Sequence, residues 1–422
     1  MGRFTFTTHG VPHGETMRHP TGRWLFPPLQ AKEWYRTRGF NEVALVHGVV
    51  EDSYRKTSRL INRMRHQPEE EGTPFRTLCD GSALEGTHIL AYVEARTEQI
   101  LAPHDVTSEG HPAEEMETAS ASTTLPSEAI QAAVEACQRS EEETEAMADN
   151  PVPYEDPSRQ TYVAIDDVGT KKQKAHRCPA LDPDPDPDPD PEAKKEKKKK
   201  KAYVYTTVAH VEHEDASYVL VGAKVVGVLR MILALLFHNR LTAPGLIFLT
   251  DGQKTLQAAI RCAFSWWGSL QLILDWYHLE KRCKEVLSRA MNGRALRNAT
   301  LEKLRPLLWH GLTDQAIRFL RGLDAEQIKK EEAREELIGY LERCQPYIPC
   351  YAVRRKLGWR NSSQIGEKMN DLVVSERQKN NGMSWSPEGS VGLAALTALI
   401  QNQEQDTWFN TGTVKLELRP AA

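Results

Sequence analysis

Residues 246–278 read LIFLTDGQKTLQAAIRCAFSWWGSLQLILDWYH, and this stretch predicts the fold class. The apolar run GLIFLT, which starts at Gly245, has the length and composition of a buried strand. The run LQLILDWYH is interpreted as a second strand that carries Asp275 and His278 at its end. Apolar residues spaced between the two runs predict a short helix, so the stretch is typical of a βαβ unit in a parallel sheet.

Acidic residues follow both predicted strands. Open α/β sheets bind their ligands at the carboxyl ends of the strands, where Asp251 and Asp275 are expected. This edge is therefore a candidate place for a metal ion or a general base. Asp251-Gly252 is also a common turn pair, which is the plainer interpretation of that aspartate.

Composition predicts a protein of two or three domains that does not enter a membrane. The chain has 422 residues, of which 40% are hydrophobic, enough for a substantial core. The N-terminus lacks the basic and apolar pattern of a signal peptide. The longest apolar run, 225–237, is too short to span a bilayer and contains Arg230, so a core helix is expected there.

The cysteines indicate a reducing compartment. None of the seven belongs to a CxxC pair or has the spacing of a zinc site, and the odd, dispersed set does not suggest a disulfide framework. We therefore expect a cytoplasmic protein, associated with the nucleoid if it binds DNA, and no structural zinc.

The net charge of −4 conceals a strong segregation of charge. Residues 103–161 contain fourteen acidic residues and two arginines, a local net charge of −12, so the rest of the chain carries about +8. We expect 103–160 to be an acidic flexible linker, with room for one helix. A mildly basic folded remainder is compatible with a nucleic-acid partner.

Residues 1–102 are predicted to form an N-terminal helical module. Within 29–64, two short amphipathic helices are separated by the turn EDS, which resembles a helix-turn-helix. Its second helix places basic residues on one polar surface, which would contact DNA phosphates; a solvated basic face is the alternative. These residues are Arg55, Lys56, Arg59 and Arg63.

The core of the protein is expected over 161–278. TYVAIDDV at 161–168 predicts a strand that ends in Asp166 and Asp167, and 202–222 predicts an antiparallel hairpin followed by a helix. Between these elements, 177–201 combines Asp-Pro repeats with a lysine run. Proline provides no N–H and restricts the residue before it, so a disordered loop is expected.

Two further regions complete the predicted organisation. Residues 279–360 show apolar positions at spacings of three and four and predict an all-α insertion. Residues 361–422 predict a helix with Glu367 at its start, then a tail. Asp166, Asp251 and Glu367 are hard oxygen ligands suited to Mg²⁺, and two such ions can activate an attacking oxygen and stabilise a leaving oxygen.

The segment IGEKMNDLVVSERQKNNGMSW, at 365–385, is the most specific motif in the chain. It resembles the C-terminal catalytic motif of bacterial insertion-sequence transposases of the DDE class, near the ISKra-like and ISLre-like groups. LTDGQKTL resembles their second acidic motif, and ILDWYHLEKR resembles an element shared with Mutator-like transposases. The matching positions of the C-terminal motif are Glu367, Asn370, Arg377, Lys379, Gly382, Met383 and Trp385.

The resemblance covers about 161–410 and implies an α/β fold, a ribonuclease-H-like mixed sheet with the all-α insertion. It implies that Asp166, Asp251 and Glu367 form a catalytic triad that binds Mg²⁺ or Mn²⁺, with two ions expected; Asp167 is the alternative first acid. Asn370 would support this triad, while Asp275 and His278 would order it, contact DNA or only stabilise the strand end. The basic residues around the C-terminal motif, among them Arg377 and Lys379, are interpreted from their charge as contacts to DNA phosphates. The implied partners are double-stranded DNA, as element ends and target, and further copies of the chain in a homo-oligomer.

Three functions follow as hypotheses. The first is a transposase that cleaves the ends of its element and transfers them to target DNA. The second is a catalytically inactive or domesticated DNA-binding protein derived from a transposase. The third is a ribonuclease-H-like nuclease that cuts without strand transfer.

Overall fold

The computed structural model divides the chain into two compact units. Unit 1 contains Met1–Tyr92, Gly169–Tyr205 and Leu372–Lys415; unit 2 contains Val93–Val168, Thr206–Asp371 and Leu416–Ala422. The residues 1–37 and the loop predicted at 177–201 lie outside the described residues. The structure describes residues 38–51, 53–64, 66, 72–112, 125–173, 202–379 and 383–420.

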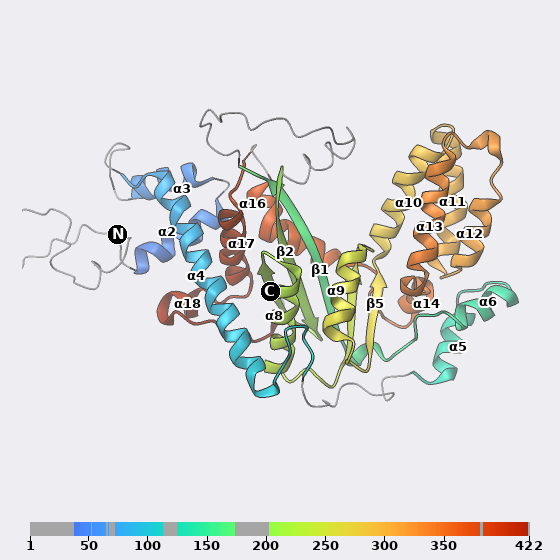
Figure 1. The fold of residues 1–422 in the computed structure, drawn as a ribbon, viewed down its shortest axis with the longest axis horizontal. Coiled ribbons are helices and arrows are strands. Elements are labelled where there is room, and N and C mark those ends of the chain that lie inside the picture. Colours follow the sequence, from blue (N-terminus) through green and yellow to red (C-terminus); the bar gives the residue numbers. More distant parts are fainter. Residues whose placement is uncertain are drawn as a thin grey trace, which may run out of the picture. The chain divides into compact units, whose positions relative to one another are not determined.

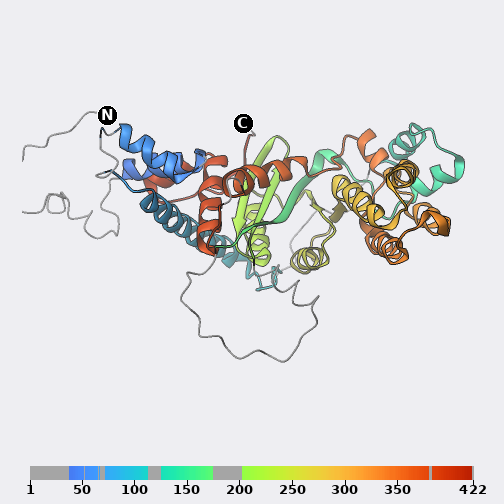
Figure 2. The same cartoon turned by 90° about the horizontal axis from the view of Figure 1, so that it is seen from above.

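A mixed six-stranded sheet with the order β5-β4-β1-β2-β3-β6 is the centre of unit 2; the ends of β1 and β2 belong to unit 1. Two crossover helices, α8 (Val225–His238) and α9 (Lys254–Phe264), lie on one face of this sheet (Figure 2). The strands are β1 (Gln160–Lys171), β2 (Tyr203–His213), β3 (Ala216–Gly222), β4 (Gly245–Thr250), β5 (Leu270–Leu274) and β6 (Arg419–Pro420).

The strand directions agree with the α/β class expected from the sequence. β1, β4 and β5 are mutually parallel, while β2 and β3 form the predicted antiparallel hairpin. β2 runs opposite to β1, because Thr161 contacts His213 whereas Asp167 contacts Thr207. The strand, helix and strand of the quoted stretch are therefore confirmed as β4, α9 and β5.

One boundary in that stretch was predicted wrongly. The second strand ends at Leu274, and Asp275 is the N-cap of helix α10 (Trp276–Ala290), whose first turn contains His278. An aspartate side chain accepts a hydrogen bond from a free N–H at a helix start, so Asp275 favours helix initiation over continuation of the strand.

Burial explains the composition of the central elements. Every residue of β4 is buried, as expected for a parallel strand covered on both faces. α8 buries Val228, Leu229 and the run Met231–Phe237, which confirms the predicted core helix. Among the described helices, none is both long and apolar enough to cross a membrane.

The residues between β5 and Lys356 are mainly helical, and helices α10 to α13 pack on one another as a bundle (Figure 1). Their core includes Leu287, Leu304, Leu320 and Leu341, all fully buried. Together with α10, the helices are α11 (Arg294–Trp309), α12 (Thr313–Arg321), α13 (Glu331–Cys344) and α14 (Tyr351–Lys356).

The described part of the acidic segment is more ordered than its composition suggests. It forms α5 (Ser127–Glu135) and α6 (Glu141–Ala148), where a flexible linker with at most one helix was expected. The fully buried side chains of Val134 and Met147 pack in a cluster with Val353 of α14. A few buried apolar residues anchor both helices. The prediction failed because the average composition of the segment is dominated by its acidic residues.

Unit 1 contains the two predicted N-terminal helices, α2 (Arg38–Val50) and α3 (Tyr54–Met64). Helix α4 (Phe75–Leu101) begins here, and α17 (Pro387–Gln401) crosses it so closely that a Cβ on Gly86 would overlap the backbone of Gly392. The other α-helices in the described part of unit 1 are α16 (Glu376–Gln378) and α18 (Gln405–Thr411).

Candidate functional site

A small cavity in unit 2 brings together most of the site residues predicted from the sequence. Its volume is about 20 Å³, enough for a water molecule or a single ion. Side chains from β1, the end of β4, α10 and α15 (Gln364–Asn370) line it. Those that can coordinate or donate are Asp166, Asp251, His278, Ser363, Glu367 and Asn370.

The strand register places Asp166 and Asp251 together, although β1 continues to Lys171 and the prediction that it ends at the two aspartates was wrong. β1 and β4 pair from Gln160 with Gly245 to Ala164 with Leu249, and the same register two residues further aligns the two aspartates. Adjacent strands lie about 4.8 Å apart, and residues at the same register point to the same face. Burial, and secondly the neighbouring Asp251, raise the pKa of Asp166 to about 6.

The structure distinguishes between the two candidates for the first acid. Asp166 lines the cavity, where its carboxylate accepts the Asp167 N–H at 2.8 Å and the Asn370 amide at 3.3 Å. The carboxylate of Asp167 accepts a hydrogen bond of 2.5 Å from the Thr207 hydroxyl on β2. Successive strand residues face opposite ways, so Asp166 alone of the pair belongs to the cavity.

Glu367 reaches the cavity from the first turn of α15. Its Oε1 lies 3.1 Å from Nε2 of His278, and burial raises its pKa while His278 opposes that shift. Gly366 makes the approach feasible, because a Cβ at this position would overlap the Cβ of Ala164 on β1. The backbone of α15 therefore lies directly against the strand that carries Asp166.

Asp275 holds the surrounding elements together. Its side chain is fully buried, and Oδ1 accepts the His278 N–H at 3.1 Å, while Oδ2 accepts the Ser363 N–H. The Trp276 N–H donates to the Asn361 carbonyl at 3.0 Å, which reinforces the same junction. Asp275 thus fixes His278 and the segment leading to Glu367, and its burial excludes a direct contact with DNA.

The aspartate pair fits a divalent cation better than the whole triad does. Mg²⁺ is often held by one or two carboxylates plus substrate phosphates, and Asp166 and Asp251 provide such oxygen donors. A cation would also favour the ionised form of Asp166 and so offset the effects of burial and of Asp251 that raise its pKa. Glu367 is bonded to His278 instead, and the described residues contain no group of three acidic, histidine or cysteine side chains placed to hold a metal.

The basic residues predicted on α3 lie on its exposed face. Arg55, Lys56, Arg59 and Arg63 are exposed, while Tyr54 and Ile61 are among the residues that bury the opposite face in unit 1. The guanidinium of Arg55 lies 4.4 Å from the centre of the Phe75 ring, which orients it along the helix surface.

Arg377, predicted to contact DNA, is instead part of the core of unit 1. Its side chain is 4% exposed, its Nε donates to the Gly48 carbonyl at 3.1 Å, and its guanidinium lies 4.5 Å from the Tyr54 ring. The prediction was wrong because the aromatic residues Tyr54 and Trp385 and the Gly48 carbonyl provide a buried binding place for the cation. Lys379, two residues on, is exposed.

Two features of the site were not foreseen. Ser363 and Gly366 lie before Glu367 in the sequence, and a glycine one residue before a candidate catalytic acid could have signalled a close backbone approach. Tyr340 and Arg343 line a second cavity that also contains Asp251 and His278. No local pattern links α13 to the end of β4, so this contact requires the tertiary structure.

Comparison with known proteins adds no further constraint. No protein-family model, no curated protein and no solved structure matches the chain.

Proposed function

We propose that the chain is a metal-dependent polynucleotidyl transferase with a ribonuclease-H-like core. In the order β5-β4-β1-β2-β3, strand β2 is antiparallel to both of its neighbours, β1 and β3, whereas β1, β4 and β5 are parallel; this arrangement supports the class. Within the class, we propose a DDE transposase that cleaves the ends of an insertion sequence and joins them to target DNA. It acts on double-stranded DNA as a homo-oligomer.

A single observation carries the proposal. Asp166, Asp251 and Glu367 are separated by 85 and 116 positions in the sequence, yet all three line one cavity beside the middle of β1 and the end of β4. Asp166 lies on β1, Asp251 directly follows the adjacent parallel strand β4, and Glu367 belongs to the helix that packs on β1. Carboxylates gathered at this edge of the sheet are suited to a two-metal phosphoryl transfer.

Cleavage adds water across a phosphodiester bond and leaves a free 3′-hydroxyl. In transfer, this hydroxyl attacks a target phosphodiester, whose 3′-oxygen leaves as the new bond forms. When bound, Mg²⁺ or Mn²⁺ would activate the attacking oxygen and stabilise the leaving oxygen. Asp166 and Asp251 would hold the cation, together with Glu367 once its carboxylate leaves His278.

The other residues of the site position these groups. Asn370 donates to Asp166 and limits the rotation of its carboxylate. Asp275 fixes the backbone of His278 and of Ser363, so the elements that carry His278 and Glu367 move together.

A second function, a DNA-binding protein without catalytic activity, is favoured by one observation. The Glu367 carboxylate is bonded to His278 and does not join the aspartate pair. In that case the exposed basic face of α3 would bind DNA and the carboxylates would have no catalytic role.

Incubation of purified protein with Mg²⁺ and a plasmid that carries the DNA flanking its gene tests the proposal. We expect the wild type to nick and join this DNA, and Asp251→Asn and Glu367→Gln to lose at least 100-fold in rate. If both variants cut and join as fast as the wild type, the triad assignment is wrong. Cutting without joining would favour a nuclease, and binding without cutting in any divalent metal would favour the non-catalytic protein.

A further inference from the structure

A second, larger cavity of unit 2 adjoins the candidate site. Its volume is about 340 Å³, and Asp251 and His278 form part of its wall as well as that of the smaller cavity. Its other lining residues include Gln253, Lys281, Arg282 and Arg343. A group bound in this cavity would therefore lie next to the reacting atoms proposed above.

The cavity wall carries more positive than negative charge. Lys281 and Arg282 come from α10 and Arg343 from α13, against the carboxylates of Asp251 and Glu285. The guanidinium groups of Arg282 and Arg343 lie 5.8 and 5.2 Å from the centre of the Tyr340 ring. These cation–π contacts with the Tyr340 ring orient both guanidinium groups at the cavity.

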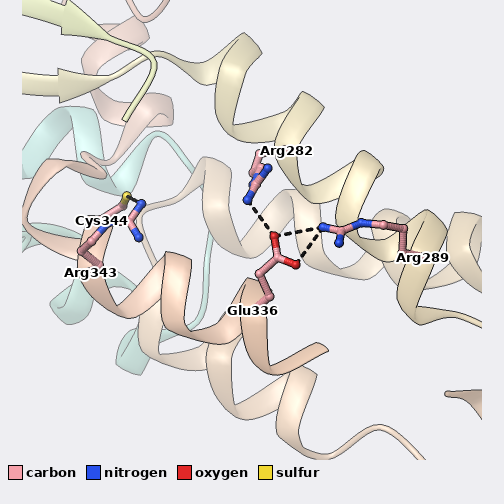
Figure 3. Close-up of polar contacts among 5 residues, drawn as sticks. All are labelled: Arg282, Arg289, Glu336, Arg343 and Cys344. Atoms are coloured by element: carbon pink, nitrogen blue, oxygen red, sulfur yellow. Dashed lines mark hydrogen bonds and ion pairs between the residues drawn. The ribbon is translucent and has the colours of Figure 1, made fainter. Parts of the chain in front are cut away.

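An ion-pair network outside the cavity holds one of these arginines in place (Figure 3). Glu336 of α13 accepts from Nη2 of Arg282 at 2.7 Å and from Arg289, one to two turns further along α10, at 2.8 Å. The hydrogen bond from Arg289 lowers the pKa of Glu336, so the carboxylate stays charged. Arginine has five N–H donors, and this contact uses one of its terminal nitrogens.

The backbone at the cavity also favours an anion. Gly252 has a φ of 85°, which lets the chain turn directly from β4 into α9. Gly252 and Gln253 line the cavity and precede the N-terminus of α9, an 11-residue helix. The N-terminus of such a helix carries partial positive charge and free N–H groups that bind phosphate.

We propose that this cavity binds a backbone phosphate of the nucleic-acid strand, next to the phosphate that reacts at Asp166 and Asp251. The inference rests on the proposed function. The volume suits one phosphate and its sugar rather than a whole duplex. Arg282, Arg343 and Lys281 offset the repulsion that a phosphate meets at the neighbouring aspartates.

The test measures binding of the full chain to a fluorescent duplex and a single-stranded oligonucleotide in EDTA, at several salt concentrations. Arg343→Gln and Arg282→Gln each remove one charge from the cavity. The matched control is Arg289→Gln, because Arg289 shares Glu336 with Arg282 but does not line the cavity. Thermal unfolding of each variant, and a charge-preserving Arg343→Lys variant, separate lost binding from lost folding.

We expect the two cavity variants to bind roughly tenfold more weakly, with a salt slope reduced by about 0.7 to 0.9 per lost phosphate contact. Arg289→Gln should bind as the wild type does, and Arg343→Lys should keep most of the affinity. Unchanged oligonucleotide binding by folded cavity variants overturns the inference and leaves the proposed function standing. Inorganic phosphate that binds through Arg343 without competing with oligonucleotide also overturns it, and a wild type that binds no DNA overturns both proposals.

Discussion

Asp166 on β1 and Asp251, the residue that follows β4, both lie two positions beyond the last residue pair of these adjacent parallel strands. This alignment follows from five backbone pairs on the N-terminal side of the two residues, so the pairing of the strands sets the distance between the carboxylates. Burial is the main cause of the raised pKa of Asp166, and the nearby carboxylate of Asp251 raises it further.

Gly366→Ala should separate Glu367 from the aspartates. The new methyl group overlaps the Cβ of Ala164, so α15 must move away from β1, at a cost of about 1 to 3 kcal/mol in the free energy of unfolding. Denaturant unfolding and DNA cleavage measure the two effects. Gly339→Ala in α13 is the control, since nothing among the described residues lies within 4 Å of its added Cβ; it should stabilise by up to ~1 kcal/mol. Equal behaviour of the two variants would contradict the close approach.

Asp275→Ala should destabilise the junction at the start of α10. It removes an N-cap and leaves the N–H groups of His278 and Ser363 without their acceptor, at a cost of about 2 to 3 kcal/mol. Urea unfolding gives the loss, and cleavage should fall with it because His278 and Glu367 are no longer held. Full stability in this variant would rule out the positioning role of Asp275.

Arg377 and Lys379 should differ although both belong to the motif that resembles a transposase. Arg377→Ala removes a buried cation from between Gly48 and Tyr54 and should cost about 3 kcal/mol in stability. Lys379→Ala is at an exposed position and should change stability by less than about 0.5 kcal/mol. Thermal unfolding distinguishes them, and similar losses in both would contradict the core position of Arg377.

The basic face of α3 should contribute to DNA affinity. Combined replacement of Arg55, Lys56, Arg59 and Arg63 by glutamine should weaken binding at low salt by roughly 100-fold or more and flatten its salt dependence. Anisotropy titrations in EDTA test this, with circular dichroism as the check on folding. Binding that keeps its affinity and salt slope would show that DNA contacts the protein elsewhere.

Stability should fall in mild acid through His210 on β2. Burial lowers the pKa of His210 from 6.5 to about 4, so the unfolded chain binds this proton first as the pH falls. The contribution of neutral His210 to the free energy of unfolding is therefore fully present above pH 6.5. It is lost as the pH falls from 6.5 to 4, by at most about 3 kcal/mol. Urea unfolding over this range should show a shallower pH dependence in His210→Gln. An identical dependence in both proteins would exclude the histidine as the cause.

Local sequence patterns were sufficient for part of the fold. The runs 245–250 and 270–274 and the helix between them followed from apolar spacing, because a buried parallel strand carries little else. The end of the second strand was predicted wrongly, although Asp275 and the apolar spacing after it are typical of a helix start. The contact of α5 and α6 with α14 depends on a few buried residues far apart in the sequence, which composition cannot reveal.

The sequence was sufficient to predict the acidic residues of the candidate site, but not the residues that surround them. Strand ends and motif resemblance selected Asp251 and Glu367, but only the register of β1 decides between Asp166 and Asp167. Charge alone suggested a surface role for Arg377, since an arginine's burial depends on aromatic partners brought together by folding. For the same reason, Arg343 became part of the site only through the packing of α13 near α10.

The most direct measurement compares two adjacent aspartates that differ in the face of β1 they occupy. Asp166→Asn and Asp167→Asn are chemically identical changes, and the rate of Mg²⁺-dependent nicking of the flanking DNA is the readout. Our account predicts that Asp166→Asn loses at least 100-fold in rate, because its carboxylate lines the cavity with Asp251, whereas Asp167→Asn keeps most of the activity. Equal rates in both variants, or loss confined to Asp167→Asn, would contradict the assignment of the site.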